Sequence, residues 1–191
     1  MDLNSTENRN KLICYFPKLN SDPHFKITSE NTTDYNCIAW AMGFDDRWVE
    51  PPSPHKPNDG RSVWWPVNAR SDMSYEALIS AFQEVGFKIC TETNVHEGYD
   101  VVVLYGDGGI WTHASRIISL NEEHSKFGES WDGIHGRQMF DGTSYGNPYA
   151  YMKRPAEERD YWINKFPLPK PTIMPNIDLL AELAKKMGLI S

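Results

Sequence analysis

Three stretches of the chain show a clear pattern of apolar and polar positions. Residues 74–86, SYEALISAFQEVG, carry apolar side chains at helical spacing between a serine and a glycine, which predicts an amphipathic helix. Residues 99–106, YDVVVLYG, form an almost continuous apolar run, which is typical of a strand buried on both faces. Residues 36–42, NCIAWAM, predict a short helix with Asn36 or Asp34 as its N-cap.

The remaining pattern predicts an antiparallel sheet that follows the helices. Strands are expected at residues 87–93, 109–120, 124–131 and 145–155, with shorter strands at residues 12–19 and 24–29. Helices followed by an antiparallel sheet make the fold class α+β. We expect one domain over residues 1–155, and we expect residues 156–191 to form a Pro-rich linker and a last helix that packs on this domain.

The segment between the two predicted helices is a long loop. Residues 45–72 contain five prolines and three tryptophans, a composition that fits neither a helix nor a strand. Loops of this length inside a domain are often functional. Trp64 and Trp65, together with Trp40 of the short helix, are therefore candidate walls of a substrate cleft. The alternative is that all three pack against the core.

Charge and composition narrow the possible partners. The net charge of −7 argues against nucleic acid and anionic membranes, because both are bound by positive surface. No apolar run approaches the length that crosses a bilayer, and the first residues lack the layout of a secretory signal, so we expect a cytoplasmic protein. Export by a signal-less route, as for an effector, stays open. The three cysteines suggest neither a disulfide framework nor a zinc-binding pair.

Cys37 is the candidate nucleophile. It opens the predicted short helix, where unpaired N–H groups carry partial positive charge, and we expect this position to lower the pKa of the thiol. The backbone amide of Cys37, with Tyr35 or Asn36 beside it, would hold an oxyanion. The alternative is a core thiol, since cysteine is among the residue types most often buried. We interpret Cys14 and Cys90 as core thiols of that kind.

His113 is the candidate base, on the strand that follows the buried strand. A thiolate nucleophile needs a histidine, and that histidine needs a third group to orient it. If the loop to the next strand covers residues 121–124, strand pairing places Asp132 opposite His113 on the same face of the sheet. A shorter loop would place Ser130 there instead.

Two further residues are alternatives for the third group. Glu129 and His135 lie close to Asp132 in the sequence and would orient the imidazole if Asp132 does not. A zinc site formed by Cys37, His113 and His135 is a rival hypothesis, but their spacing fits no common zinc module. We therefore expect neither a metal nor a cofactor.

Several phrases of the sequence resemble an uncharacterised bacterial family, a domain of unknown function with Trp-rich loops. The phrases are YNCIAWAMG, RWVEPP, WWP, AFQEVGFKIC, THASR, SKFG followed by an aspartate and a histidine, and YG followed by KRP. They occur in this order over most of the first 155 residues. The resemblance implies a site at Cys37, His113 and either Asp132 or His135, and it implies no particular substrate.

The order of the cysteine, the histidine and the acid is also similar to that of papain-like cysteine peptidases and amidases, including the NlpC and CHAP types. The SKFG phrase resembles the Ser-Lys-Trp-Gly phrase of some of these amidases, with Phe127 in place of the tryptophan. This likeness implies a papain-like fold, in which an N-terminal catalytic helix packs on the antiparallel sheet.

The sequence thus predicts a thiol-dependent hydrolase or acyl-transferase. Its substrate would be an amide bond in a peptide, in a peptidoglycan fragment or in a protein side chain. A catalytically inactive papain-like module that binds a protein partner, as an immunity protein does, is the first alternative. A protein deamidase with the same triad is the second.

Overall fold

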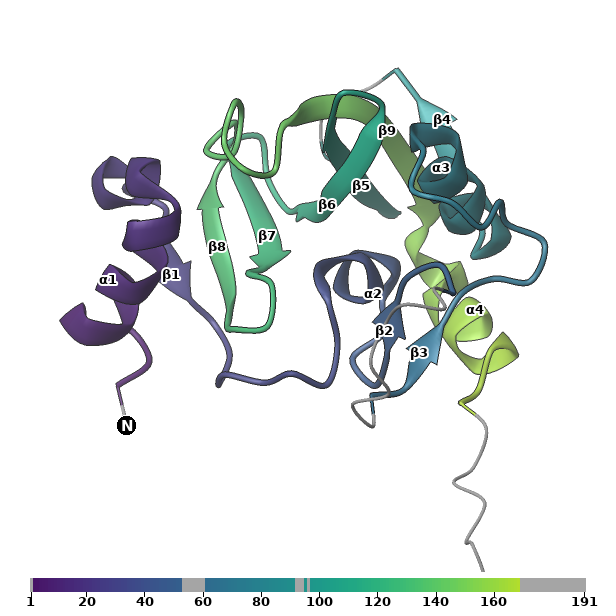
Figure 1. The fold of residues 1–191 in the computed structure, drawn as a ribbon, viewed down its shortest axis with the longest axis horizontal. Coiled ribbons are helices and arrows are strands. Elements are labelled where there is room, and N and C mark those ends of the chain that lie inside the picture. Colours follow the sequence, from purple (N-terminus) through teal and green to yellow (C-terminus); the bar gives the residue numbers. More distant parts are fainter. Residues whose placement is uncertain (1, 53–60, 92–94, 96, 169–191) are drawn as a thin grey trace, which may run out of the picture.

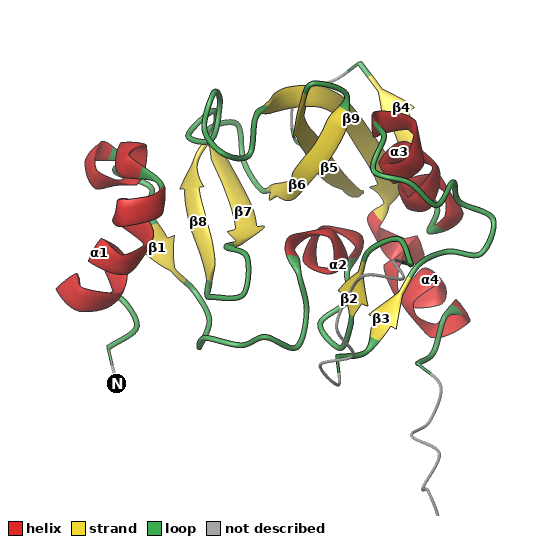
Figure 2. Ribbon diagram, in the orientation of Figure 1, coloured by secondary structure: helices red, strands yellow, loops and turns green. Residues whose placement is uncertain are grey.

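A seven-stranded antiparallel sheet forms the centre of the fold (Figures 1 and 2). The computed structural model describes residues 2–52, 61–91, 95 and 97–168. The order of the strands in the sheet is β1-β8-β7-β6-β5-β9-β4. Their bounds are β1 (Lys26–Ile27), β4 (Lys88–Cys90), β5 (Tyr99–Asp107), β6 (Ile110–Ile117), β7 (Glu122–Lys126), β8 (Asp132–Gly136) and β9 (Asn147–Pro155). A separate parallel pair consists of β2 (Trp48–Val49) and β3 (Val63–Trp64).

Helices cover both faces of this sheet. The described helices are α1 (Thr6–Tyr15), η1 (Pro17–Ser21), α2 (Cys37–Met42), α3 (Tyr75–Glu84), η2 (Ala156–Glu158) and α4 (Arg159–Lys165). Along β5, Val102 and Leu104 pack into a core with α2 and α3, whereas Val101 and Val103 pack into a second core with α1 and η1. The central strand is therefore buried on both faces, which confirms the interpretation of its apolar run.

The amphipathic helix is confirmed as α3. The Ser74 hydroxyl caps it by accepting a hydrogen bond from the backbone amide of Ala77 at 3.2 Å. Gly86 follows the helix with a φ of 90°, and a Cβ on this glycine would lie 2.2 Å from the indole nitrogen of Trp162. Both the backbone conformation and the tight contact require glycine at this position. The α+β class with an antiparallel sheet is likewise confirmed.

Both ends of the chain differ from the prediction. The segment around Cys14 is the helix α1, capped by Ser5, and not an edge strand; Cys14 is consequently exposed and not a core thiol. At the other end, α4 lies within the stretch that we expected to be a linker. The predicted last helix falls outside the described residues.

The buried guanidinium of Arg154 on β9 joins the two main helices to the sheet. Its nitrogens donate to the backbone oxygens of Val85, at the end of α3, and of Met42, at the end of α2, each at 3.0 Å. It also donates to the Asp100 carboxylate of β5 at 2.9 Å. One side chain therefore satisfies the terminal carbonyls of both helices, which have no partner within their own helix.

We expect Arg154→Met to lower the free energy of unfolding by about 3 kcal/mol or more, because two buried carbonyls and a carboxylate lose their donor. Urea denaturation measures this loss. Arg70→Met is the matched control: Arg70 is exposed and pairs with Asp72 at the surface, so we expect a change below about 1 kcal/mol. Equal stabilities of the two variants would contradict the role of Arg154.

Candidate functional site

The N-terminus of α2 is fixed by Asn36, which is the predicted N-cap. Its Oδ1 accepts hydrogen bonds from the backbone amides of Ala39 at 3.0 Å and of Val49 at 3.2 Å, and its Nδ2 donates to the Val49 oxygen at 3.0 Å. This buried side chain joins α2 to β2. Asn36 therefore has a structural role, and its amide group is not available for the predicted role of binding an oxyanion.

Cys37 opens α2 as a partly exposed residue. Burial of the thiol raises its pKa to about 11, although the backbone amides of Ala114 and Ile38 and the Lys126 ammonium act in the opposite direction. The expectation of an acidic thiol was wrong. A helix terminus contributes about 1 kcal/mol or less, which is under one pKa unit, and α2 has only six residues. At neutral pH the resting thiol keeps its proton.

His113 lies on β6 and is completely buried. Its ring stacks on Tyr145, with ring centroids 3.9 Å apart and an angle of 3° between the planes. Its Nε2 lies 3.2 Å from the Ser125 hydroxyl of β7, whereas its Nδ1 has no hydrogen-bond partner among the described residues. Burial holds the pKa of this imidazole well below its ordinary value, so the ring is neutral at neutral pH.

The neighbouring hydrogen bonds determine which ring nitrogen of His113 carries the proton. His135 Nδ1 lies 2.9 Å from the Gly136 carbonyl and must donate to it, so His135 Nε2 has a lone pair. That lone pair accepts the Ser125 proton at 2.8 Å. The Ser125 oxygen, having given its proton to His135, accepts from the Ser115 hydroxyl at 2.7 Å and from His113 Nε2–H. The lone pair of His113 therefore resides on Nδ1, where no group occupies it.

The ladder between β6 and β7 has a gap at the level of His113. The ladder between these strands consists of the pairs Arg116–His124 and Ile117–Glu123, so the strands are unpaired at the level of His113. The helix α2, which carries Cys37, packs against β6, and the backbone amide of Ala114, the residue after His113, favours the thiolate form of Cys37. Both residues are fully described, and no hydrogen bond joins the sulfur to the imidazole.

The predicted partner of His113, Asp132, lies elsewhere. The turn after β6 covers residues 118–121, so β7 begins earlier than expected, and Asp132 opens β8 opposite Lys126. The Asp132 carboxylate accepts the Tyr35 hydroxyl proton at 2.6 Å. This contact also corrects the oxyanion role of Tyr35, because its hydroxyl proton is already donated.

The two other candidates for the third group differ from each other. Glu129 is exposed and pairs with Arg61 at 2.7 Å, away from the imidazole. His135 is buried and reaches His113 through the Ser125 hydroxyl. Of the residues named from the sequence, His135 is therefore the one that takes part in orienting His113.

Sequence reasoning missed Ser125 and Lys126, the first two residues of the SKFG phrase. Consecutive residues of a strand point to opposite faces. Ser125 points toward His113, whereas Lys126 is a buried cation whose charge acts on Cys37. The Lys126 ammonium donates to the backbone oxygens of Thr32 and Ser130. The correct register for β7 would have placed Ser125 on the face of His113 and Lys126 on the opposite face, because the pairs of the ladder fix which side chains share a face.

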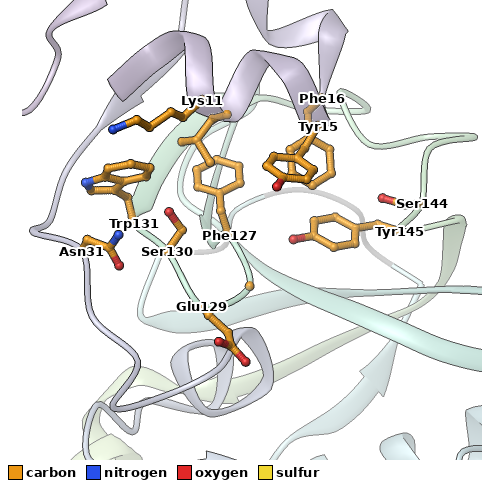
Figure 3. Close-up of a pocket in the computed structure, with 12 residues that line it drawn as sticks. Lys11, Tyr15, Phe16, Asn31, Phe127, Glu129, Ser130, Trp131, Ser144 and Tyr145 are labelled. Atoms are coloured by element: carbon orange, nitrogen blue, oxygen red, sulfur yellow. The ribbon is translucent and has the colours of Figure 1, made fainter. Parts of the chain in front are cut away.

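A cavity of about 580 Å³ lies next to α1 (Figure 3). Its lining comes from α1, from the turn between β7 and β8, and from the segment before β9. Tyr145 lines the cavity and also stacks on His113. Burial and the nearby Cys37 raise the pKa of Tyr145. This one side chain therefore connects the cavity with the ring of His113.

A comparison with known protein families identifies the family of the chain. The profile of a domain of unknown function, DUF7689, matches residues 26–153. The chain belongs to the DUF7689 family. No curated protein and no solved structure matches the chain. The resemblance to an uncharacterised family is thereby confirmed, whereas the papain-like type of the DUF7689 fold stays a prediction.

The DUF7689 match contains every candidate catalytic residue and leaves α1 and α4 outside it. Among the described residues, no group of three or more histidines, cysteines and carboxylates is arranged to hold a metal ion. The helices described for this chain include none that is long and apolar enough to cross a membrane.

The tryptophans proposed as cleft walls pack against the core of the DUF7689 domain. Trp40 stacks on Tyr35, Trp64 packs against Phe44, and Trp65 stacks on Trp111. Their packing is the one expected under the alternative interpretation, and none of them lines the described cavity. Residues 53–60 of the long loop lie outside the described part of the chain.

We expect two-bond proton–nitrogen NMR correlations to show His113 as the Nε2–H tautomer at neutral pH. In Ser125→Ala the Nε2 proton loses its acceptor, so the signals should shift toward a mixture of both tautomers. Ser80→Ala, on α3, removes a hydroxyl that donates to the backbone oxygen of Ala77, and this change should leave the spectrum unchanged. A proton on Nδ1 in the unmodified chain would refute the assignment.

Proposed function

We propose that this DUF7689 protein is a thiol-dependent hydrolase or acyl-transferase that acts on an amide bond. Cys37 is the nucleophile and His113 is the general base, held by Ser125 and His135. The observation that carries the proposal is the unoccupied lone pair on His113 Nδ1. A buried imidazole nitrogen without a partner is costly, and such groups are concentrated at functional sites.

The reaction follows from the resting protonation states. The Cys37 thiol proton moves to His113 Nδ1 while the sulfur attacks the carbonyl carbon. The carbonyl oxygen becomes an oxyanion beside the backbone amides of Cys37 and Ala114. The imidazolium then returns the proton to the departing amine, and a thioester remains on the sulfur. Water or a second amine attacks this thioester and restores the thiol.

A substrate of peptide type is the one most compatible with the charges of the chain. The net charge of −7 disfavours polyanions. The cavity beside Tyr145 is lined mainly by apolar and aromatic side chains, which suits a peptide side chain better than a sugar. These features support a peptide, a peptide portion of a cell-wall fragment or a protein side chain as the acyl donor.

A binding module without catalysis is the second candidate, and three observations favour it. The pKa of Cys37 is raised to about 11, and no hydrogen bond joins its sulfur to His113 among the described contacts. In addition, Cys37 packs with the core of α2, whereas the ring of His113 lies against Phe140 of the other core. In this case the two residues would be structural, and the cavity alone would be functional.

We expect p-nitrophenyl esters of acetylated amino acids to give a burst of p-nitrophenol that is stoichiometric with the chain. Mass spectrometry should locate the acyl group on Cys37. Cys37→Ala should abolish the burst, whereas Cys14→Ala, which removes an exposed thiol on α1, should preserve it. Acylation that maps only to Cys14 or to lysines would refute the proposal.

The pH profile of this burst distinguishes an assisted thiol from an ordinary one. Burial lowers the pKa of His113 and raises that of Cys37 to about 11, so both groups keep their reactive neutral forms between these values. We therefore expect a level acylation rate from about pH 6.5 to about pH 9. In His113→Ala the rate should follow the thiolate fraction and rise about tenfold per pH unit.

The matched control for that profile is His24→Ala, since His24 pairs with Glu122 away from the site. Its rate should stay level across the same range. A profile in the unmodified chain that already rises like that of His113→Ala would exclude His113 as the base and would favour the binding module.

A further inference from the structure

The cavity beside Tyr145 is enclosed mainly by aromatic side chains. Figure 3 shows the rings of Tyr15 and Phe16 from α1, of Phe127 and Trp131 from the turn after β7, and of Tyr145 around one space. Its volume of about 580 Å³ lies within the range of small-ligand sites. The site is thus large enough for an aromatic side chain with its flanking backbone.

The charges at the cavity are already paired. Among the described lining residues, Lys11 and Glu129 are the charged ones. Lys11 forms an ion pair with Glu7 at 2.8 Å, and Glu129 forms one with Arg61 at 2.7 Å. A charged ligand would lose its hydration without gaining an unpaired counter-charge. The cavity therefore favours a neutral, apolar occupant.

The cavity also adjoins the candidate base, His113, through the ring of Tyr145. Tyr145 lines it, and the Tyr145 hydroxyl approaches the backbone amide of Gly128 in the opposite wall. The same tyrosine stacks on His113 and lies close enough to Cys37 for the charge of the thiolate to raise its pKa. A group that occupies the cavity consequently places its neighbouring atoms at Tyr145, beside the ring of His113.

We propose that this cavity is the specificity pocket of the enzyme and receives a large apolar or aromatic side chain on the acyl side of the scissile amide. The assignment rests on the proposed function. Part of the pocket comes from α1, which lies outside the residues matched by the family. Tyr15 of α1 lines the cavity and is 77% exposed, so its ring is accessible to a ligand.

The test is an acylation series with the full chain. Acetylated p-nitrophenyl esters of phenylalanine, leucine, alanine, aspartate and lysine are compared at equal pH, each corrected for its spontaneous hydrolysis. The phenylalanine and leucine esters should acylate Cys37 at least about tenfold faster than the alanine ester, because burial of these side chains is favourable. The aspartate and lysine esters should be no faster than the alanine ester.

Two variants locate this preference. Tyr15→Ala should reduce the preference for phenylalanine over alanine about threefold or more, since it removes an aromatic face from the rim. Tyr161→Ala is the matched control, because Tyr161 is a 60% exposed tyrosine on α4 that does not line the cavity. Both substitutions are at exposed positions, so the fold should be retained, and circular dichroism checks this.

The outcomes separate the pocket from the catalytic proposal. Acylation of Cys37 at equal rates for all five esters would overturn the pocket and leave the proposed function standing. Absence of acylation on Cys37 would sink the proposed function, and binding of acetyl-phenylalanine amide would then decide the pocket. Saturable NMR shifts at Phe127 and Trp131, absent with acetyl-lysine amide, would support an apolar pocket. No shifts with either amide would overturn it.

Discussion

The guanidinium of Arg154 holds the two helices of the site in one arrangement with the sheet. It binds the last carbonyl of α2 and the carbonyl that follows α3, and it is itself held by the Asp100 carboxylate. A helix of six residues has little stability of its own. The position of α2 therefore depends on Arg154 at its C-terminal end and on Asn36 at its N-terminal end. Together these two residues place the Cys37 sulfur at β6.

The second constraint is the short ladder between β6 and β7. Because pairing stops at Arg116 and His124, the backbone amide of Ala114 is free to meet the Cys37 sulfur, and the gap lies between the two cores. A full ladder would separate the thiol and the imidazole by a continuous sheet. At the level of this gap, the Tyr145 ring lies against His113.

The sequence predicted what depends on local pattern. The cap at Asn36, the helix α3 and the twice-buried strand β5 follow from residues close together in the chain, and all three were found. The partner of His113 depends instead on the register of β7, which a turn of Ser119 and Asn121 sets. Because this turn ends earlier than predicted, the residue beside His113 is Ser125 and not Asp132. The thiol pKa was missed for a similar reason, since burial is a property of the assembled core.

Under the proposed function, the protonation states of the site suit a nucleophile that is inactive until a substrate binds. Moving the thiol proton to His113 creates an ion pair in a buried region, which is costly without compensation. Lys126 and the backbone amides beside the sulfur favour the thiolate, but in the resting chain burial outweighs them. A bound carbonyl changes this balance, because the negative charge then moves to an oxygen that these amides can bind. The same burial that raises the thiol pKa would therefore confine its reactivity to acyl groups that fit the site.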